Sequence, residues 1–110
     1  MSIQNLDEVD LIGVNKEIGR IELAIIDDLD WNDVKSHLLI LQDKVNAYLG
    51  FIESGQIYES YPEASSFRPV IQVLAQYSLP KEGREFMEKL KIFLDEVGYD
   101  FEFKMALVRE

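Results

Sequence analysis

Residues 27–55 read DDLDWNDVKSHLLILQDKVNAYLGFIESG and predict one long amphipathic helix that is marked at both ends. The aspartates at its start put negative charge where the free amides of a first helical turn favour it, and Asp30 is suited to cap the helix before Trp31. Gly55 is suited to end it. Between these ends, apolar residues recur at helical spacing, so one face should lie on a core: Val34, Leu38, Leu41, Val45, Tyr48, Leu49 and Ile52.

Two β-rich segments precede this helix, at residues 9–14 and 20–26. The turn-like segment between them ends in Gly19, so together they predict a β-hairpin. Residues 56–67 contain Pro, Ser and aromatic residues without a sustained period, which indicates an ordered loop pinned to the body by its aromatics. A third strand is expected over residues 69–76.

A second helix is expected next, with Ser78 as its cap, Pro80 in its first turn and Gly98 as the left-handed residue beyond its end. Its predicted buried face consists of Phe86, Leu90, Phe93, Leu94 and Val97. The alternation that follows, over residues 99–105, predicts a fourth strand. The order ββαβαβ then favours an α+β two-layer sandwich, in which two helices cover one face of a four-stranded mixed sheet.

Length and composition predict a single domain spanning residues 1–110, since 47% hydrophobic residues in 110 is ample for one core. No long apolar run and no basic-then-apolar leader occur, so we expect a cytoplasmic protein without a membrane segment. The chain has no cysteine, which excludes disulfides, thiolate metal ligands and a cysteine nucleophile.

The formal net charge is −10, from 21 acidic and 11 basic side chains. Such a charge repels nucleic-acid phosphates and anionic membranes, so binding to either is not expected. Two explanations of the acidity stay open: it keeps the protein in solution, or it forms an acidic face for a basic protein partner.

His37 is the only histidine, and any acid–base role of an imidazole must fall on it. Asp33 lies one helical turn before it and could pair with it, favouring the protonated ring. No nucleophile–base pair is recognisable, and we predict no catalytic residue. The aspartates of residues 27–33 lack the spacing of a calcium loop, and the glycines lack phosphate-loop spacing, so neither a metal nor a cofactor is expected.

Candidate binding residues are nevertheless present. Glu59 and Glu63 with Tyr58 and Tyr61 resemble a polar aromatic rim that could bind a ligand, although anchoring of a loop is the preferred interpretation. The binding candidates are His37, Asp33, Glu53, Tyr58 and Tyr61.

Some apolar residues are left over once the core is assigned. They fall on the second face of the sheet or off the helical stripes, and they are candidates for an interface: Ile26, Val70, Leu74, Leu39 and Ile40. They favour a homodimer or a protein partner, with isolated exposed apolar residues on a monomer as the alternative.

Taken in order, the segments VDLIG (9–13), LDW (29–31), HLLILQDKVNAYL (37–49) and FIESG (51–55) resemble a small bacterial family of uncharacterised stand-alone proteins. The resemblance continues through Tyr58 and residues 61–62 to residues 98–101. It implies a stand-alone bacterial domain in which the helix of residues 37–46 and the turn of residues 53–55 are shared features. It implies no activity.

The leading hypothesis is therefore a non-catalytic, acidic protein-binding module, of the immunity or inhibitor kind. The alternative is a small enzyme or ligand-binding protein that uses His37 with Asp33, Glu53 or a loop tyrosine.

Overall fold

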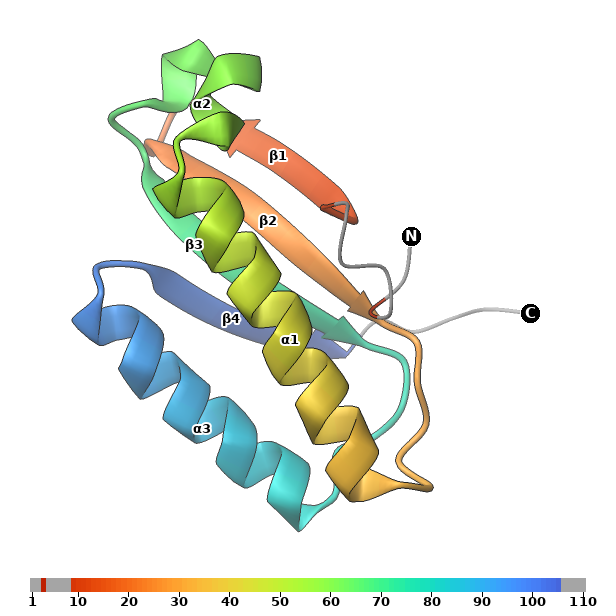
Figure 1. Cartoon of the computed structure of the whole chain (residues 1–110). Helices are drawn as coiled ribbons and strands as arrows, with labels where there is room; N and C mark the ends of the chain where they lie inside the picture. The colour runs from red at the N-terminus through yellow and green to blue at the C-terminus, as the bar shows by residue number, and fades with distance from the viewer. Residues whose placement is uncertain (1–2, 4–8, 106–110) are drawn as a thin grey trace.

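The computed structural model describes residues 3 and 9–105. The described elements are β1 (Leu11–Asn15), β2 (Arg20–Asp27), α1 (Val34–Glu53), α2 (Gln56–Ser60), the 3-10 turn η1 (Pro62–Ala64), β3 (Arg68–Ala75), α3 (Lys81–Glu96) and β4 (Asp100–Met105). The sheet has the order β1-β2-β3-β4, in which β1 is antiparallel to β2 and the pairs β2–β3 and β3–β4 are parallel. Both long helices lie on one face of it (Figure 1), which confirms the predicted α+β sandwich.

The predicted hairpin is also confirmed, with Leu11 opposite Ala24 and Asn15 opposite Arg20. Gly19 closes its turn with a φ of 68°, and Gly55 and Gly98 have positive φ beyond the ends of α1 and α3. These are left-handed backbone conformations that residues other than glycine rarely adopt. The segment expected to be a loop differs, because residues 56–64 form α2 and η1. Buried Ile57 and partly buried Tyr58, Tyr61 and Phe67 pin it to the core, as the aromatics indicated.

The sheet has two different faces, because successive side chains of a strand point to opposite sides. Ile21, Leu23 and Ile25 of β2 point toward the helices and are fully buried, together with Ile71 and Val73 of β3. The other face, called the open face below, carries charged side chains of β2 and β4. No helix among residues 9–105 has the length and apolar character needed to cross a membrane.

The first helix begins later than predicted. Asp27 is the last residue of β2, and residues 28–33 connect that strand to α1. Asp33, not Asp30, is the N-cap: its side chain accepts hydrogen bonds from the backbone N–H and the hydroxyl of Ser36, which lower the pKa of Asp33. Asp30 instead accepts a bond from the N–H of Asn32 within the connection. An aspartate-rich segment therefore contained both a strand end and a cap.

The second helix is rotated relative to the prediction. Phe93 is 50% exposed and Val97 is also exposed, whereas Met87, expected off the buried face, is buried with Leu90 and Leu94. The reason is that α3 packs mainly on the edge strand β4 and touches α1 only lightly, so the side facing α1 stays partly open. Ser78 does not cap it: Pro80 is the N-cap residue, and no side chain bonds to the first turn.

Candidate functional site

The predicted pairing of His37 with Asp33 is wrong, because the imidazole of His37 bonds to Asp27 and Asp30 instead. Its Nε2 lies 2.7 and 2.8 Å from the two carboxylate oxygens of Asp27, and its Nδ1 lies 2.8 Å from the carbonyl oxygen of Asp30. A carbonyl only accepts, so Nδ1 carries a hydrogen, and the contact between Nε2 and the carboxylate requires one more proton. Burial raises the pKa of Asp27 and outweighs the opposing effect of the bond from His37.

Trp31 covers this pair. Its ring stacks on the imidazole of His37, with 3.5 Å between ring centroids and 11° between planes. It also reaches the start of α3, where a Cβ added to Gly83 would lie 3.1 Å from the indole Cη2. With His37 at 2% exposure and Asp27 at 1%, neither side chain can touch a substrate. The contacts of His37 hold the connection between β2 and α1 against the helix. The geometry therefore gives no support to the alternative of an enzyme that uses His37.

A second buried ion pair lies two helical turns further along α1. Lys44 Nζ lies 3.0 Å from a carboxylate oxygen of Asp10, and both side chains have no exposed surface. Asp10 also accepts from the N–H of Ile26, and its own N–H donates to the hydroxyl of Tyr48. That hydroxyl donates in turn to the carbonyl of Ala24, and burial raises the pKa of Tyr48. The arrangement ties α1 to β2 and to the start of β1.

Sequence reasoning missed this second pair because Lys44 falls between the apolar positions Leu41, Val45 and Tyr48 on the helix, where a lysine is usually expected to reach solvent. The available signal was its spacing: Lys44 follows His37 by seven residues and so lies on the same helical face.

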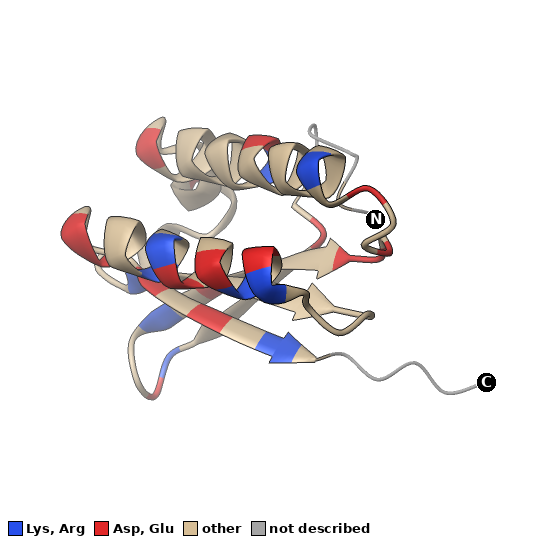
Figure 2. Ribbon diagram, turned by 90° about the horizontal axis from the view of Figure 1, so that it is seen from below, with Lys and Arg blue, Asp and Glu red and all other residues tan. Residues whose placement is uncertain are grey.

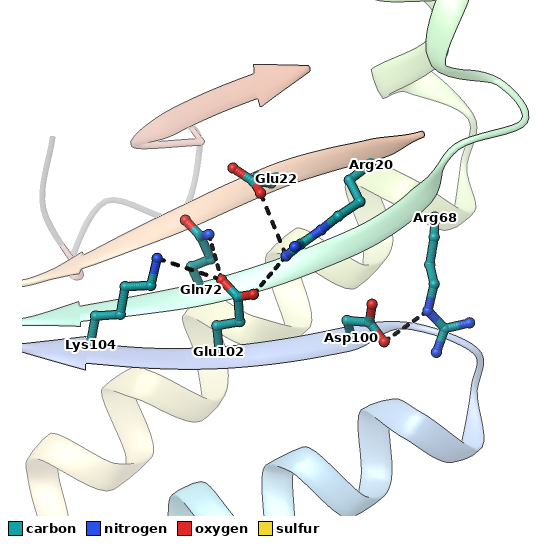
Figure 3. A network of polar contacts seen from close by, with 7 residues as sticks. All are labelled: Arg20, Glu22, Arg68, Gln72, Asp100, Glu102 and Lys104. Atoms are coloured by element: carbon teal, nitrogen blue, oxygen red, sulfur yellow. Dashed lines mark hydrogen bonds and ion pairs between the residues drawn. The ribbon is translucent and has the colours of Figure 1, made fainter. Parts of the chain in front are cut away.

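The open face of the sheet carries a network of polar contacts, shown in Figure 3. Arg20 donates to Glu102 at 2.7 Å, Gln72 donates to the other carboxylate oxygen of Glu102 at 2.8 Å, and Arg68 donates to Asp100 at 2.8 Å. The bond from Arg20 lowers the pKa of Glu102. These residues surround Val70 in the strand register, and Val70 is fully buried.

The interface residues predicted on this face are therefore less exposed than the sequence indicated. Val70, predicted to face solvent, is 0% exposed, and Ile26 and Leu74 are half-buried. The physical reason is that the long charged side chains of neighbouring strands cover the apolar positions between them. Of the helical candidates, Leu39 is exposed, and Ile40 is partly buried against the core.

A hollow of about 640 Å³ lies where β1, the end of α1 and α2 meet, and we call it the α1–α2 hollow. It is lined by apolar and aromatic side chains, small hydroxyls and one exposed helical glycine: Val9, Ile12, Ala47, Tyr48, Gly50, Phe51, Ser54, Gln56, Ser60 and Tyr61. Gly50 has no packing reason to be glycine, because a Cβ built on it would meet nothing within 4 Å. Glycine inside a helix costs about 0.5–1 kcal/mol relative to alanine. Its effect here is to leave open space at this position in the lining of the hollow.

The segment of residues 45–64, from the second half of α1 to the end of η1, which builds most of this hollow, carries only negative charge. Glu53, Glu59 and Glu63 are exposed, and no lysine or arginine occurs in residues 45–67. Lys44 is buried, and Arg68 is paired with Asp100. Moreover, Glu53 occupies the last turn of α1, where the negative end of the helix dipole favours a cation, and that turn has no basic residue.

The structure brings together some of the predicted binding residues and separates others. Glu53 and Tyr58 lie near Tyr99, whose pKa is raised by burial and then by these two groups. Tyr61 lines the α1–α2 hollow. His37 and Asp33 belong to the other end of α1, so the five candidates do not form one site. Within the part of the chain that the structure describes, no group of three or more potential ligands could hold a metal ion.

A family model described as "Family of unknown function (DUF6572)" matches residues 1–107. No curated protein matches the chain, and no solved structure matches it.

Proposed function

We propose that this chain, which belongs to the family of unknown function DUF6572, is a non-catalytic protein-binding module that takes up a basic segment of a partner at the α1–α2 hollow. The observation that carries the proposal is a concave, partly aromatic surface built mainly by residues 45–61, within a segment (residues 45–67) that has three exposed carboxylates and no basic residue. Binding sites combine an apolar hollow with a few polar groups that orient the ligand.

The chemistry of the partner follows from the local field. A lysine or arginine side chain entering the hollow would lie near the negative end of the α1 dipole, because Phe51 and the C-cap residue Ser54 line the hollow. Phe51 and Tyr61 would offer aromatic faces to the cation. The net charge of −10 would speed the encounter with a basic protein, as in modules of the immunity or inhibitor kind.

The test is binding of short synthetic peptides that alternate basic and apolar residues, measured by fluorescence anisotropy. We expect binding that weakens as salt rises, because charges on the rim are screened. Gly50→Leu should abolish it by filling the hollow, and Glu53→Lys should weaken it about tenfold or more, since like charges across an interface cost several kcal/mol. Glu82→Lys, the same change at the start of α3, is the matched control and should bind as the parent does.

Equal affinity for the parent and Gly50→Leu would refute the proposal, and so would equal affinity for basic and neutral peptides. A pull-down from the source cell with the parent and Gly50→Leu as paired baits extends the test to the natural partner. A partner retained by both baits binds elsewhere, and turnover of a metabolite by the purified protein without any partner would favour the enzyme alternative.

We further propose a bacterial, cytoplasmic setting for this module, supported by the resemblance of its motifs to a family of bacterial proteins. The homodimer expected from the sequence also stays a proposal. Its predicted surface at Ile26, Val70 and Leu74 is replaced by the one argued below, since Val70 is covered.

A further inference from the structure

One flank of α3 carries charges of alternating sign in a single row. The row consists of Arg84, Glu88, Lys91 and Asp95, all exposed, at helical spacings of four, three and four residues that place them on one side. This side faces away from α1, because Phe86, Lys89 and Phe93 line the hollow between α1 and α3. Figure 2 looks at the molecule with α3 toward the viewer and shows both red and blue segments along it.

The order of charges in this row is complementary to the same row running in the opposite direction. In a second copy that runs antiparallel, Arg84 of one chain lies opposite Asp95 of the other, and Glu88 lies opposite Lys91. Both pairings share one midpoint, between residues 89 and 90, so a single twofold axis forms four ion pairs. This is the condition for an isologous interface, in which residue i meets j and j meets i.

We propose that this flank of α3, together with the edge strand β4 beneath it, is a homodimer interface between two antiparallel copies of the chain. In the described residues, β4 pairs with β3 alone, so its other edge has no strand beside it. The unpaired N–H and C=O groups of such an edge are a ready template for pairing with a strand of another chain.

The edge strand has the same symmetry as the helix. If Phe103 lies at the axis, Glu102 of one copy comes opposite Lys104 of the other. Lys104 is exposed, and its nearest acidic contact is its own Glu102 at 3.8 Å, so it is available for a closer partner. Opposite charges directly across two strands stabilise their pairing.

The two midpoints lie at the same level of the molecule. Glu88 shares one surface hollow with Phe103, and Lys91 shares another with Phe101 and Glu102. The middle of the α3 row is therefore level with residues 101–103, and one axis can serve both elements.

Apolar surface beside the row also fits this partner. Ile92 is 62% exposed, the highest value among the large hydrophobic residues that are described as exposed. It lies about 2.5 residues from the midpoint, so the two copies of Ile92 would be offset by about 7–8 Å along the helices at 1.5 Å per residue. Side chains at that offset can touch, and each would shield the other from water.

Charge favours a second copy over another acidic surface or a basic protein. The row is electrically neutral, with two cations and two anions, on a chain whose net charge is −10. A uniformly basic partner would meet Arg84 and Lys91, and an acidic one would meet Glu88 and Asp95. Only a partner with the reversed pattern is matched at every position, and this chain supplies one.

The experiment exchanges the central charges. Glu88→Lys alone places a lysine against Lys91 of the other copy twice, and Lys91→Glu alone places two glutamates together twice. Like charges across an interface cost several kcal/mol, so each single variant should raise the dimer Kd by about tenfold or more. An equimolar mixture of the two variants restores both central pairs and should form the heterodimer. Sedimentation velocity reads the outcome, since the monomer is 12.7 kDa.

Lys89→Glu and Glu96→Lys are the matched controls, because these residues lie seven apart on the opposite side of α3 and carry the same charge changes. We expect both to dimerise as the parent does. A monomeric parent at all concentrations refutes the proposal, as does a dimer that tolerates both single variants or a mixture that stays monomeric. Because the α1–α2 hollow lies beside β1, at the other edge of the sheet, peptide binding should be unchanged in every α3 variant, and the two proposals fail independently.

Discussion

The two faces of the sheet use the same kind of contact, an acidic side chain with a basic one, in opposite surroundings. On the helix side, the pairs Asp10–Lys44 and Asp27–His37 have almost no exposed surface. On the open face, Arg20–Glu102 and Arg68–Asp100 are hydrated, with side chains about a quarter to a half exposed. An ion pair in water is worth little, whereas a buried charge that loses its partner is strongly unfavourable. The faces should therefore respond very differently to the same substitution.

The largest difference is expected from removing one carboxylate on each side. Asp10→Ala removes the carboxylate paired with Lys44 and should lower the free energy of unfolding by about 3–5 kcal/mol. Asp100→Ala on the open face should lower it by about 1 kcal/mol or less. Urea denaturation followed by circular dichroism measures both. Similar losses would mean that the two faces do not differ in the way described.

A second comparison concerns apolar side chains of the two long helices that differ in burial. Leu41 is fully buried, so Leu41→Ala should cost about 2–5 kcal/mol. Phe93 is half exposed on the side of α3 that faces α1, so Phe93→Ala should cost clearly less, about 1 kcal/mol. A thermal melt of the two variants suffices, and equal shifts in Tm would show that α3 is packed as the sequence pattern predicted.

The two faces should also give pH dependences of opposite sign. Burial raises the pKa of Asp27, so its contribution to stability is present below its unfolded pKa and is lost as pH rises through the folded value. The bond from Arg20 lowers the pKa of Glu102, so its contribution is present above its unfolded pKa and is lost as pH falls through the folded value.

Two amide variants separate these contributions in urea titrations from acidic to neutral pH. Asp27→Asn should remove a decline in stability toward higher pH, and Glu102→Gln should remove a decline toward lower pH. Parallel changes in the two variants would contradict the assignment of opposite signs to the two faces.

The smallest change in stability is expected at Gly50, an exposed residue of α1. Gly50→Ala should stabilise the protein by about 0.5–1 kcal/mol, because alanine favours the helix and its Cβ meets no atom within 4 Å. The measurement is again the free energy of unfolding in urea. A destabilised variant would show that glycine is needed there for packing, and the case for an open hollow would weaken.

The hairpin, the two long helices and the mixed sheet could be predicted because their patterns are local. Apolar spacing in residues 34–52 and alternation in residues 99–105 reflect faces that each element presents to the core. The rotation of α3 could not be predicted, because Phe93 and Met87 are both apolar, and only the position of α3 over β4 decides which is buried.

The site was harder to predict for the same reason. Partners of His37 and Lys44 come from β2 and from the residue before β1, so sequence neighbours such as Asp33 misled the pairing. Val70 was expected to face solvent. The side chains that cover it, Arg20 and Glu102, are 82 residues apart in sequence, so no local pattern indicates that they meet over Val70. Tyr61 was identified as a binding candidate, but the hollow that it lines exists only once β1 and α2 meet.

The stacking of Trp31 on His37 has a practical consequence. Trp31 is the only tryptophan in the chain, so its emission reports on a single place in the molecule, the connection between β2 and α1. A charged imidazole in face contact quenches an indole more strongly than a neutral one, and a ring released into water emits at longer wavelength. Excitation of the native, unlabelled protein therefore reads out both the protonation of the buried pair and the detachment of the connection that covers it.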